Sequence, residues 1–167
     1  MTASAPIIFN SPEYACWHEA GHVEAALRVG ARVTEVELYR DPVRSYGRTR
    51  VERTDAQADE IALGGFGVEY LLYRQDRLLK EDGTAPTEKE FIDHAIANAS
   101  DDYEGYWKHR PLQAAMLSEK DRDWNFMNEA IGRAKARIDL SVVERIVTAL
   151  RATDILDEEA VKAALAI

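Results

Sequence analysis

The stretch from Ser11 to Gly30 constrains the fold of this chain more than any other segment. Ser11 supplies a capping hydroxyl, Pro12 follows at the first helical position, and Glu13 places an acid in the first turn, so a helix is predicted to begin here. Gly30 is typical of the residue that follows a helix. Much of the helix surface is apolar, through Tyr14, Ala15, Trp17, Val23, Ala26 and Leu27. The sequence therefore predicts a helix that is buried on most sides.

Two histidines of this helix, His18 and His22, are four residues apart. Residues at this spacing lie on one side of a helix, so both imidazoles can bind one metal ion. Glu19 lies about 100° around the helix, beside the ion, where a carboxylate can take a proton from a metal-bound water. Zinc lowers the pKa of such a water toward about 7, so that hydroxide can attack a carbonyl. The motif predicts a hydrolytic zinc site with Glu19 as general base. The alternative is a pair of helix histidines satisfied by hydrogen bonds.

A hydrolytic zinc site usually has three protein ligands and one open position, and the motif supplies only two ligands. A third histidine six residues after His22 would continue the metzincin pattern, but Arg28 stands there and Ala25 replaces the required glycine. Spacing alone does not choose among the remaining candidates, which are Glu60, Glu69, His94, Asp101, Asp102 and His109.

A small β element is predicted directly after this helix. Residues 33–38 alternate and are rich in β-branched side chains, which favours a strand. Residues 47–51 are predicted to return as a second strand. Glu35 and Glu37 would then face Arg48 and Arg50, either as cross-strand partners or as charges on a solvated face.

The rest of the chain is predicted to be helical, and the predicted fold class is therefore mainly α. Thr54, Thr87 and Ser141 each precede a Gln or Glu by three residues, which is the capping-box pattern of a helix start. A polar loop with both Gly and Pro is predicted over 79–86. The predicted helices cover residues 55–76, 87–108, 111–137, 141–152 and 157–165.

The composition is that of a globular domain. The chain has 167 residues, of which 46% are hydrophobic and 31% charged, which suits one domain with a sizeable core. We predict a short tail over residues 1–10 and a single domain over 11–167. Within it, 11–110 hold the metal-ligand candidates and 111–167 form a C-terminal helical half. The net charge of −9 disfavours nucleic-acid binding.

The sequence also indicates the cellular compartment in which we expect the protein. The single cysteine, Cys16, excludes a disulfide within one chain and fits a reducing compartment. It is predicted to be a small buried hydrophobic residue. No apolar run approaches the roughly 20 residues of a membrane span, and the N-terminus does not match a secretory signal. We expect a cytoplasmic protein.

Four segments, in order, resemble the peptidase domain of the FtsH-type ATP-dependent zinc proteases. Residues 15–22 contain the family's His-Glu-Ala-Gly-His motif, and residues 61–69 resemble its Ala-Leu-Gly-Gly-Arg-Ala-Ala-Glu helix. Residues 99–103 are similar to its Ala-Ser-Asn-Asp-Leu segment, and residues 155–161 are similar to its closing Thr-Leu-Asp-Gly-Glu-Glu-Val segment. The resemblance spans nearly the whole chain.

The resemblance implies a third zinc ligand. In that family it is the aspartate before the leucine, which corresponds here to Asp102, with Tyr103 in the leucine's place. Asp101 replaces the family's asparagine and is a competing carboxylate. Adjacent helical residues point about 100° apart, so both are not expected to bind one ion. Glu69 matches a family glutamate near the site and is expected either to hydrogen-bond a ligand histidine or to lie on the surface.

Two further predictions concern the neighbours of the site, the first from helix propensity and the second from the resemblance. The glycines Gly64, Gly65 and Gly67 would each weaken a helix, which favours close helix packing, against the metal helix in our prediction. The family strand after the zinc helix lies beside the cleft, so residues 33–38 are expected to pair with an extended substrate.

The implied activity is zinc-dependent endopeptidase cleavage of peptides or unfolded proteins. The family's ATPase and membrane segments have no counterpart in this sequence, so a separate unfoldase is a possible partner. A homo-oligomer, hexameric by analogy, is a further expectation. The alternative is a catalytically silent, peptidase-like binding or regulatory module.

Overall fold

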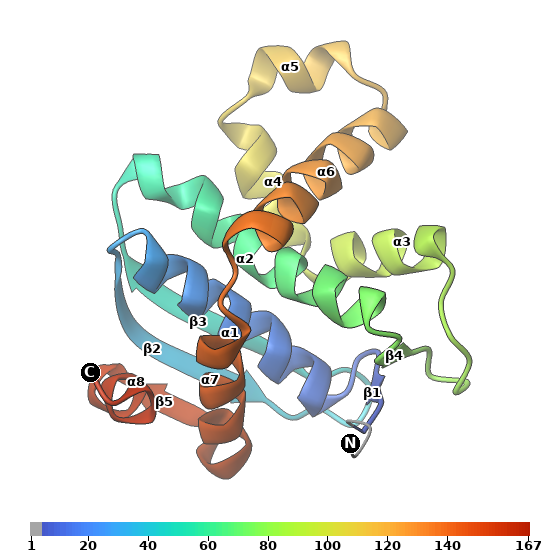
Figure 1. Cartoon of the computed structure of the whole chain (residues 1–167). Helices are drawn as coiled ribbons and strands as arrows, with labels where there is room; N and C mark the ends of the chain where they lie inside the picture. The colour runs from blue at the N-terminus through green and yellow to red at the C-terminus, as the bar shows by residue number, and fades with distance from the viewer. Residues whose placement is uncertain (1–4) are drawn as a thin grey trace.

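The computed structural model describes residues 5–167, and its described residues confirm a mainly α fold with a small sheet (Figure 1). The helices are α1 (Pro12–Arg28), α2 (Asp55–Arg74), α3 (Glu88–Asn98), α4 (Ser100–Lys108), α5 (Pro111–Met116), α6 (Glu119–Arg137), α7 (Leu140–Thr153) and α8 (Glu158–Leu165). The strands are β1 (Ile7–Ile8), β2 (Arg32–Tyr39), β3 (Tyr46–Glu52), β4 (Leu78–Leu79) and β5 (Ile155–Asp157).

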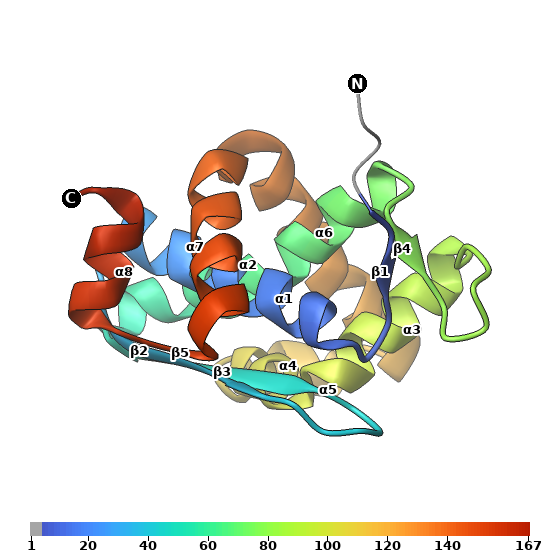
Figure 2. The same ribbon diagram turned by 90° about the horizontal axis from the view of Figure 1, so that it is seen from below.

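Helix α1 is the central element of the fold. Ser11 caps it by accepting a hydrogen bond from the backbone N–H of Tyr14 at 3.2 Å, and Pro12 occupies the first turn, as predicted. Every residue from Tyr14 to Ala26 is buried. The helix packs against α2, α7, β2 and β3, and Figures 1 and 2 show the sheet on one side of it. A single hydrophobic core joins α1 and α2 to α6 and α7, so the N- and C-terminal parts of the chain share their interior.

The sheet beside α1 has the strand order β3-β2-β5 and is antiparallel. The predicted hairpin is present, with Glu35 opposite Arg50 and Glu37 opposite Arg48. Arg50 forms ion pairs with both Glu35 (3.1 Å) and Glu37 (3.4 Å). The third strand, β5, comes from the C-terminal part of the chain and was not predicted.

This strand order corrects the expectation that residues 33–38 pair with a substrate. Strand β2 is central, because β3 pairs along one edge and β5 pairs with residues 35–37 on the other. Its hydrogen-bonding groups are therefore largely occupied. Within residues 5–167, β3 is the strand beside α1 with a free edge.

A second pair of strands corrects the predicted tail over residues 1–10. Residues 1–4 lie outside the described part of the chain, but β1 pairs in parallel with β4, aligning Ile7 with Leu78. Ile7 and Phe9 are buried in the core. Apolar side chains just before α1 therefore belong to the folded domain, and Leu79, the first residue of the predicted loop, forms a strand together with Leu78.

Two predicted helices are each broken into two. The helix predicted over 87–108 is interrupted at Ala99, whose φ of −126° and ψ of 52° end α3 and begin α4. The helix predicted over 111–137 is interrupted at Leu117, and Ser118 then caps α6 by accepting from the N–H of Asp121.

Two of the three predicted capping boxes, those at Thr54 and Thr87, are present. Reciprocal bonds between Thr87 and Glu90 start α3, and the side chain of Gln57 accepts from the backbone N–H of Thr54 at 2.8 Å. The box predicted at Ser141 is wrong. Asp139 caps α7 instead, because its carboxylate accepts from both the N–H and the hydroxyl of Ser141.

Candidate metal centre and adjoining cavity

His18 and His22 project from consecutive turns of α1 toward one point. Both are buried, and their Nε2 atoms lie 2.9 Å apart. Asp102, the third residue of α4, places Oδ2 3.2 Å from Nε2 of His22 and 3.7 Å from Nε2 of His18. Within the described residues, these three side chains form a group whose ligand atoms lie close enough to hold a metal ion.

The spacing of these three atoms suits a small cation. Ligands about 2.0–2.1 Å from a zinc ion, at tetrahedral angles, stand roughly 3.3 Å from one another. The observed separations of 2.9, 3.2 and 3.7 Å bracket this value. The donor set therefore fits an ion of this size with shifts of only a few tenths of an ångström.

The outer nitrogen of each imidazole is held by an acceptor on α2. Nδ1 of His18 lies 2.6 Å from Oε1 of Glu69, and Nδ1 of His22 lies 2.7 Å from the carbonyl oxygen of Ile61. A carbonyl oxygen and a carboxylate oxygen accept hydrogen bonds, so both Nδ1 atoms carry the proton in the neutral rings. Each Nε2 then presents a lone pair to the other and to Asp102. Such orienting partners are typical of metal-binding histidines.

The electrostatics of the cluster follow from this arrangement. Burial alone would lower the pKa of His18, but the carboxylates of Glu69 and Asp102 outweigh it and raise that pKa well above its usual range. The pKa of His22 is also raised, because Asp102 outweighs burial. Burial would raise the pKa of Asp102, but His22 and His18 hold it well below its usual range. The site therefore attracts positive charge.

Glu19 lies beside this cluster and is also buried. The hydroxyl of Thr49 donates to its Oε2 at 2.6 Å. Gly47, two residues earlier on the same face of β3, approaches so closely that a Cβ there would lie 2.2 Å from Cγ of Glu19. Strand β3 thus packs over Glu19 and fixes its carboxylate. Neither Thr49 nor Gly47 was singled out from the sequence, because only the strand register reveals that they face α1.

The predicted glycine cluster is where α1 and α2 meet. A Cβ on Gly64 would lie 2.4 Å from the carbonyl oxygen of Gly21, and one on Gly65 would lie 2.5 Å from Cε1 of His18. Close packing against the metal helix is therefore confirmed for both. A Cβ on Gly67 would instead lie 2.7 Å from Cδ1 of Ile138. The close approach brings Glu69 and the Ile61 carbonyl within reach of the histidines.

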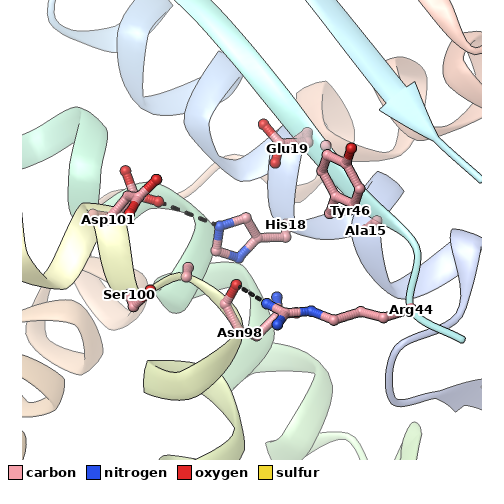
Figure 3. A pocket seen from close by; sticks show the side chains of 11 residues that line it. Ala15, His18, Glu19, Arg44, Tyr46, Asn98, Ser100 and Asp101 are labelled. Carbon is pink, nitrogen blue, oxygen red and sulfur yellow. Dashed lines mark hydrogen bonds and ion pairs between the residues drawn. The ribbon is translucent and has the colours of Figure 1, made fainter. Parts of the chain in front are cut away.

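A cavity of about 440 Å³ opens beside the cluster, and Figure 3 shows the side chains around it. His18 and Glu19 form one wall, and the start of α4 with Asp101 and Asp102 forms another. Ser100 at the start of α4 and Ala15 of α1 also line the cavity, together with Arg44 from the β2–β3 connection, Tyr46 and Gly47 from β3, and Asn98 and Ala99 at the end of α3. A substrate in this cavity would contact the cluster directly.

The other ligand candidates lie elsewhere. Asp101 is exposed and outside the metal group, although it lines the cavity. Glu60 forms ion pairs with Arg28, Arg133 and Arg137. The ring of His94 stacks on Phe9 with a centroid distance of 3.8 Å, and His109 is exposed at the end of α4. Cys16 is buried, as predicted, and burial raises the pKa of its thiol to about 12.

Comparison of the chain with protein-family models, curated proteins and solved structures gives no match. None of the described helices is long and apolar enough to cross a bilayer.

Proposed function

We propose that this protein is a zinc-dependent endopeptidase that cleaves peptides or unfolded protein segments, with Glu19 as general base. The observation that carries the proposal is the convergence of two imidazole lone pairs and one carboxylate oxygen on a single point, beside a separately held carboxylate. A hydrolytic zinc site needs three protein ligands, an open position and a base. The resemblance to the FtsH-type peptidase domain supports the same assignment.

The donor set favours zinc over other common ions. Two imidazoles and one carboxylate suit zinc, whereas magnesium and calcium prefer sites built from oxygen atoms. The three ligands, His18, His22 and Asp102, leave the cavity side of the cluster for water and substrate. When bound, zinc would lower the pKa of a water and polarise the substrate carbonyl.

The residues of the chain supply the proton transfers and the positioning. Glu19 accepts a proton from the attacking water and delivers it to the leaving nitrogen. The Thr49 hydroxyl donates a hydrogen bond to Oε2 of Glu19, and this bond fixes the plane of the carboxylate. Glu69 and the Ile61 carbonyl keep the rings of His18 and His22 in the tautomer that binds metal.

The free edge of β3 provides the route for an extended substrate. Gly47 and Tyr46 of this strand line the cavity, and a peptide added along the edge would pass Glu19. Backbone pairing of this kind requires an unfolded segment. Folded substrates would therefore need a separate unfoldase.

The decisive test is cleavage of a quenched fluorescent peptide and of casein by the zinc-loaded protein. Glu19→Gln should reduce kcat by at least about 100-fold, the usual contribution of a general base, while zinc content stays at the wild-type level. Thr49→Ser, which keeps the hydroxyl, is the matched control and should remain active. Zinc-loaded protein that cleaves neither substrate, or undiminished cleavage by Glu19→Gln, would contradict the proposal and favour a silent binding module.

A further inference from the structure

The cavity beside the metal cluster holds one guanidinium, that of Arg44, opposite His18 (Figure 3). The connection that carries it is anchored on both sides. Asp41 accepts hydrogen bonds from the backbone N–H groups of Val43 and Arg44, and the N–H of Ser45 donates to the carbonyl of Asn10 at 2.9 Å. Ser45 itself is buried. The segment that carries Arg44 is thus held by backbone hydrogen bonds, and the exposed side chain of Arg44 lines the cavity.

Arg44 has no carboxylate partner within residues 5–167, in contrast to Arg40 and Arg50 of the same hairpin. Arg40 pairs with Asp154, and Arg50 pairs with Glu35 and Glu37. The hydrogen bond found for Arg44 goes to the backbone carbonyl of Asn98. A guanidinium has five N–H donors in a planar fork that matches a carboxylate, so most of the donors of Arg44 remain available.

The carboxylates that line the cavity do not form ion pairs with Arg44 among the described residues. The acidic groups of the cavity are Glu19, Asp101 and Asp102. Glu19 is held by Thr49, Asp102 belongs to the metal cluster, and Asp101 is exposed at the start of α4. A ligand that enters the cavity therefore meets a guanidinium that has no carboxylate partner among the described residues and that lines the same cavity as His18 and Glu19.

We propose that Arg44 binds a carboxylate of the substrate and so makes acidic peptides the preferred class. The proposal rests on the proposed peptidase function, since it places the carboxylate beside the bond to be cleaved. The carboxylate is either an Asp or Glu side chain close to that bond or a free C-terminus. Charge-assisted, bidentate bonds of this type are about twice as strong as neutral hydrogen bonds, which supplies the selectivity.

The test measures binding separately from cleavage. Fluorescein-labelled octapeptides, each with one Glu placed at successive positions and with the Gln counterpart, are titrated into zinc-loaded Glu19→Gln protein and followed by fluorescence anisotropy. A second arm compares a C-terminal carboxylate with its amide. We expect one acidic position, in one arm, to bind about tenfold more tightly than its neutral counterpart, which corresponds to about 1.4 kcal/mol.

The variants identify the residue responsible. Arg44→Gln should remove the preference for the acidic peptide, and Arg44→Glu should shift the preference toward a Lys-containing peptide. Arg48→Gln is the matched control, because Arg48 is exposed on β3 and does not line the cavity; it should keep the preference. Added salt should weaken the preference, since the guanidinium is open to solvent.

Equal affinities for the acidic and neutral peptides in both arms, or an unchanged preference in Arg44→Gln, would overturn the proposal. A cleavage assay on the wild-type protein then distinguishes a wrong role for Arg44 from a wrong peptidase function. Cleavage without a preference for acid contradicts only the role of Arg44. An Arg44-dependent preference in binding without any cleavage contradicts only the peptidase function.

Discussion

The contact between Gly21 and Gly64 predicts that α1 tolerates no side chain at its crossing with α2. A Cβ added at Gly21 would lie 2.5 Å from the carbonyl oxygen of Gly64 and 2.9 Å from Cα of Gly65. Both obstacles are backbone atoms and cannot rotate away. Restoring an ordinary contact of 3.4 Å requires the two helices to separate by about 0.9 Å. Gly21→Ala therefore acts on the frame of the metal site without touching a ligand.

The magnitude follows from two opposing contributions. Replacing a helical glycine by alanine favours the helix by about 1 kcal/mol. Overpacking costs about 1–3 kcal/mol, and obstruction by backbone places this site at the upper end. The net destabilisation is about 2 kcal/mol, which lowers Tm by about 4–8 °C in a chain of this size.

The matched control is Gly132→Ala in α6, where no atom lies within 4 Å of the added Cβ. The control should raise Tm by about 2–4 °C, because it gains helix propensity without a clash. Thermal unfolding followed by circular dichroism, on protein with and without zinc, measures both changes. Gly21→Ala should also bind zinc more weakly, since His18 lies on α1 and its partner Glu69 lies on α2. Equal and same-signed Tm shifts for the two variants would refute the reasoning.

Three further predictions concern the metal. Asp102→Ala should lose stoichiometric zinc, measured by atomic absorption after dialysis, whereas Asp101→Ala should retain it, because Asp101 lies outside the cluster; the reverse result would reassign the ligand. Glu69→Gln should weaken zinc binding about 10–100-fold in competition with a chelator, the usual effect of removing a partner of a ligand histidine; unchanged affinity would make Glu69 a packing residue. The pKa values of His18 and His22 are raised, so protons compete with zinc above the usual histidine pKa of about 6.5. Zinc affinity should therefore keep rising as pH increases from 6.5 to 8.5, and a flat calorimetric profile over this range would contradict the arrangement.

The local parts of this structure could be predicted from the sequence. Ser11 and Pro12 define the start of α1 through contacts within one turn, and the spacing of His18 and His22 requires only helical geometry. The glycines Gly64 and Gly65 pointed to a close helix contact because no local preference favours them in a helix. Each of these features is determined by residues near one another in the chain.

The parts that were missed depend on distant partners. Strand β1 forms only because β4 pairs with it, and β5 joins the sheet from the far end of the chain. The break at Ala99 has no Gly or Pro to announce it, yet it starts the helix that carries Asp102. Spacing could not choose between Asp101 and Asp102, and the resemblance alone favoured the second. The cavity residue Arg44 and the Glu19 partner Thr49 likewise became visible only when β3 was placed against α1.

The arrangement of His18, His22 and Asp102 is itself an argument for a cation. Three acceptors that converge in a buried site repel one another unless a positive charge lies between them. Without an ion, protons on the rings take that place, because the pKa values of His18 and His22 are raised. Two protonated rings would then face each other with their Nε2 atoms 2.9 Å apart. Because Glu69 and the Ile61 carbonyl hold both rings by their outer nitrogens, neither ring can turn to relieve the repulsion. A divalent ion would satisfy all three acceptors at once, and outer hydrogen bonds of this kind on both rings are typical of histidines that bind metal.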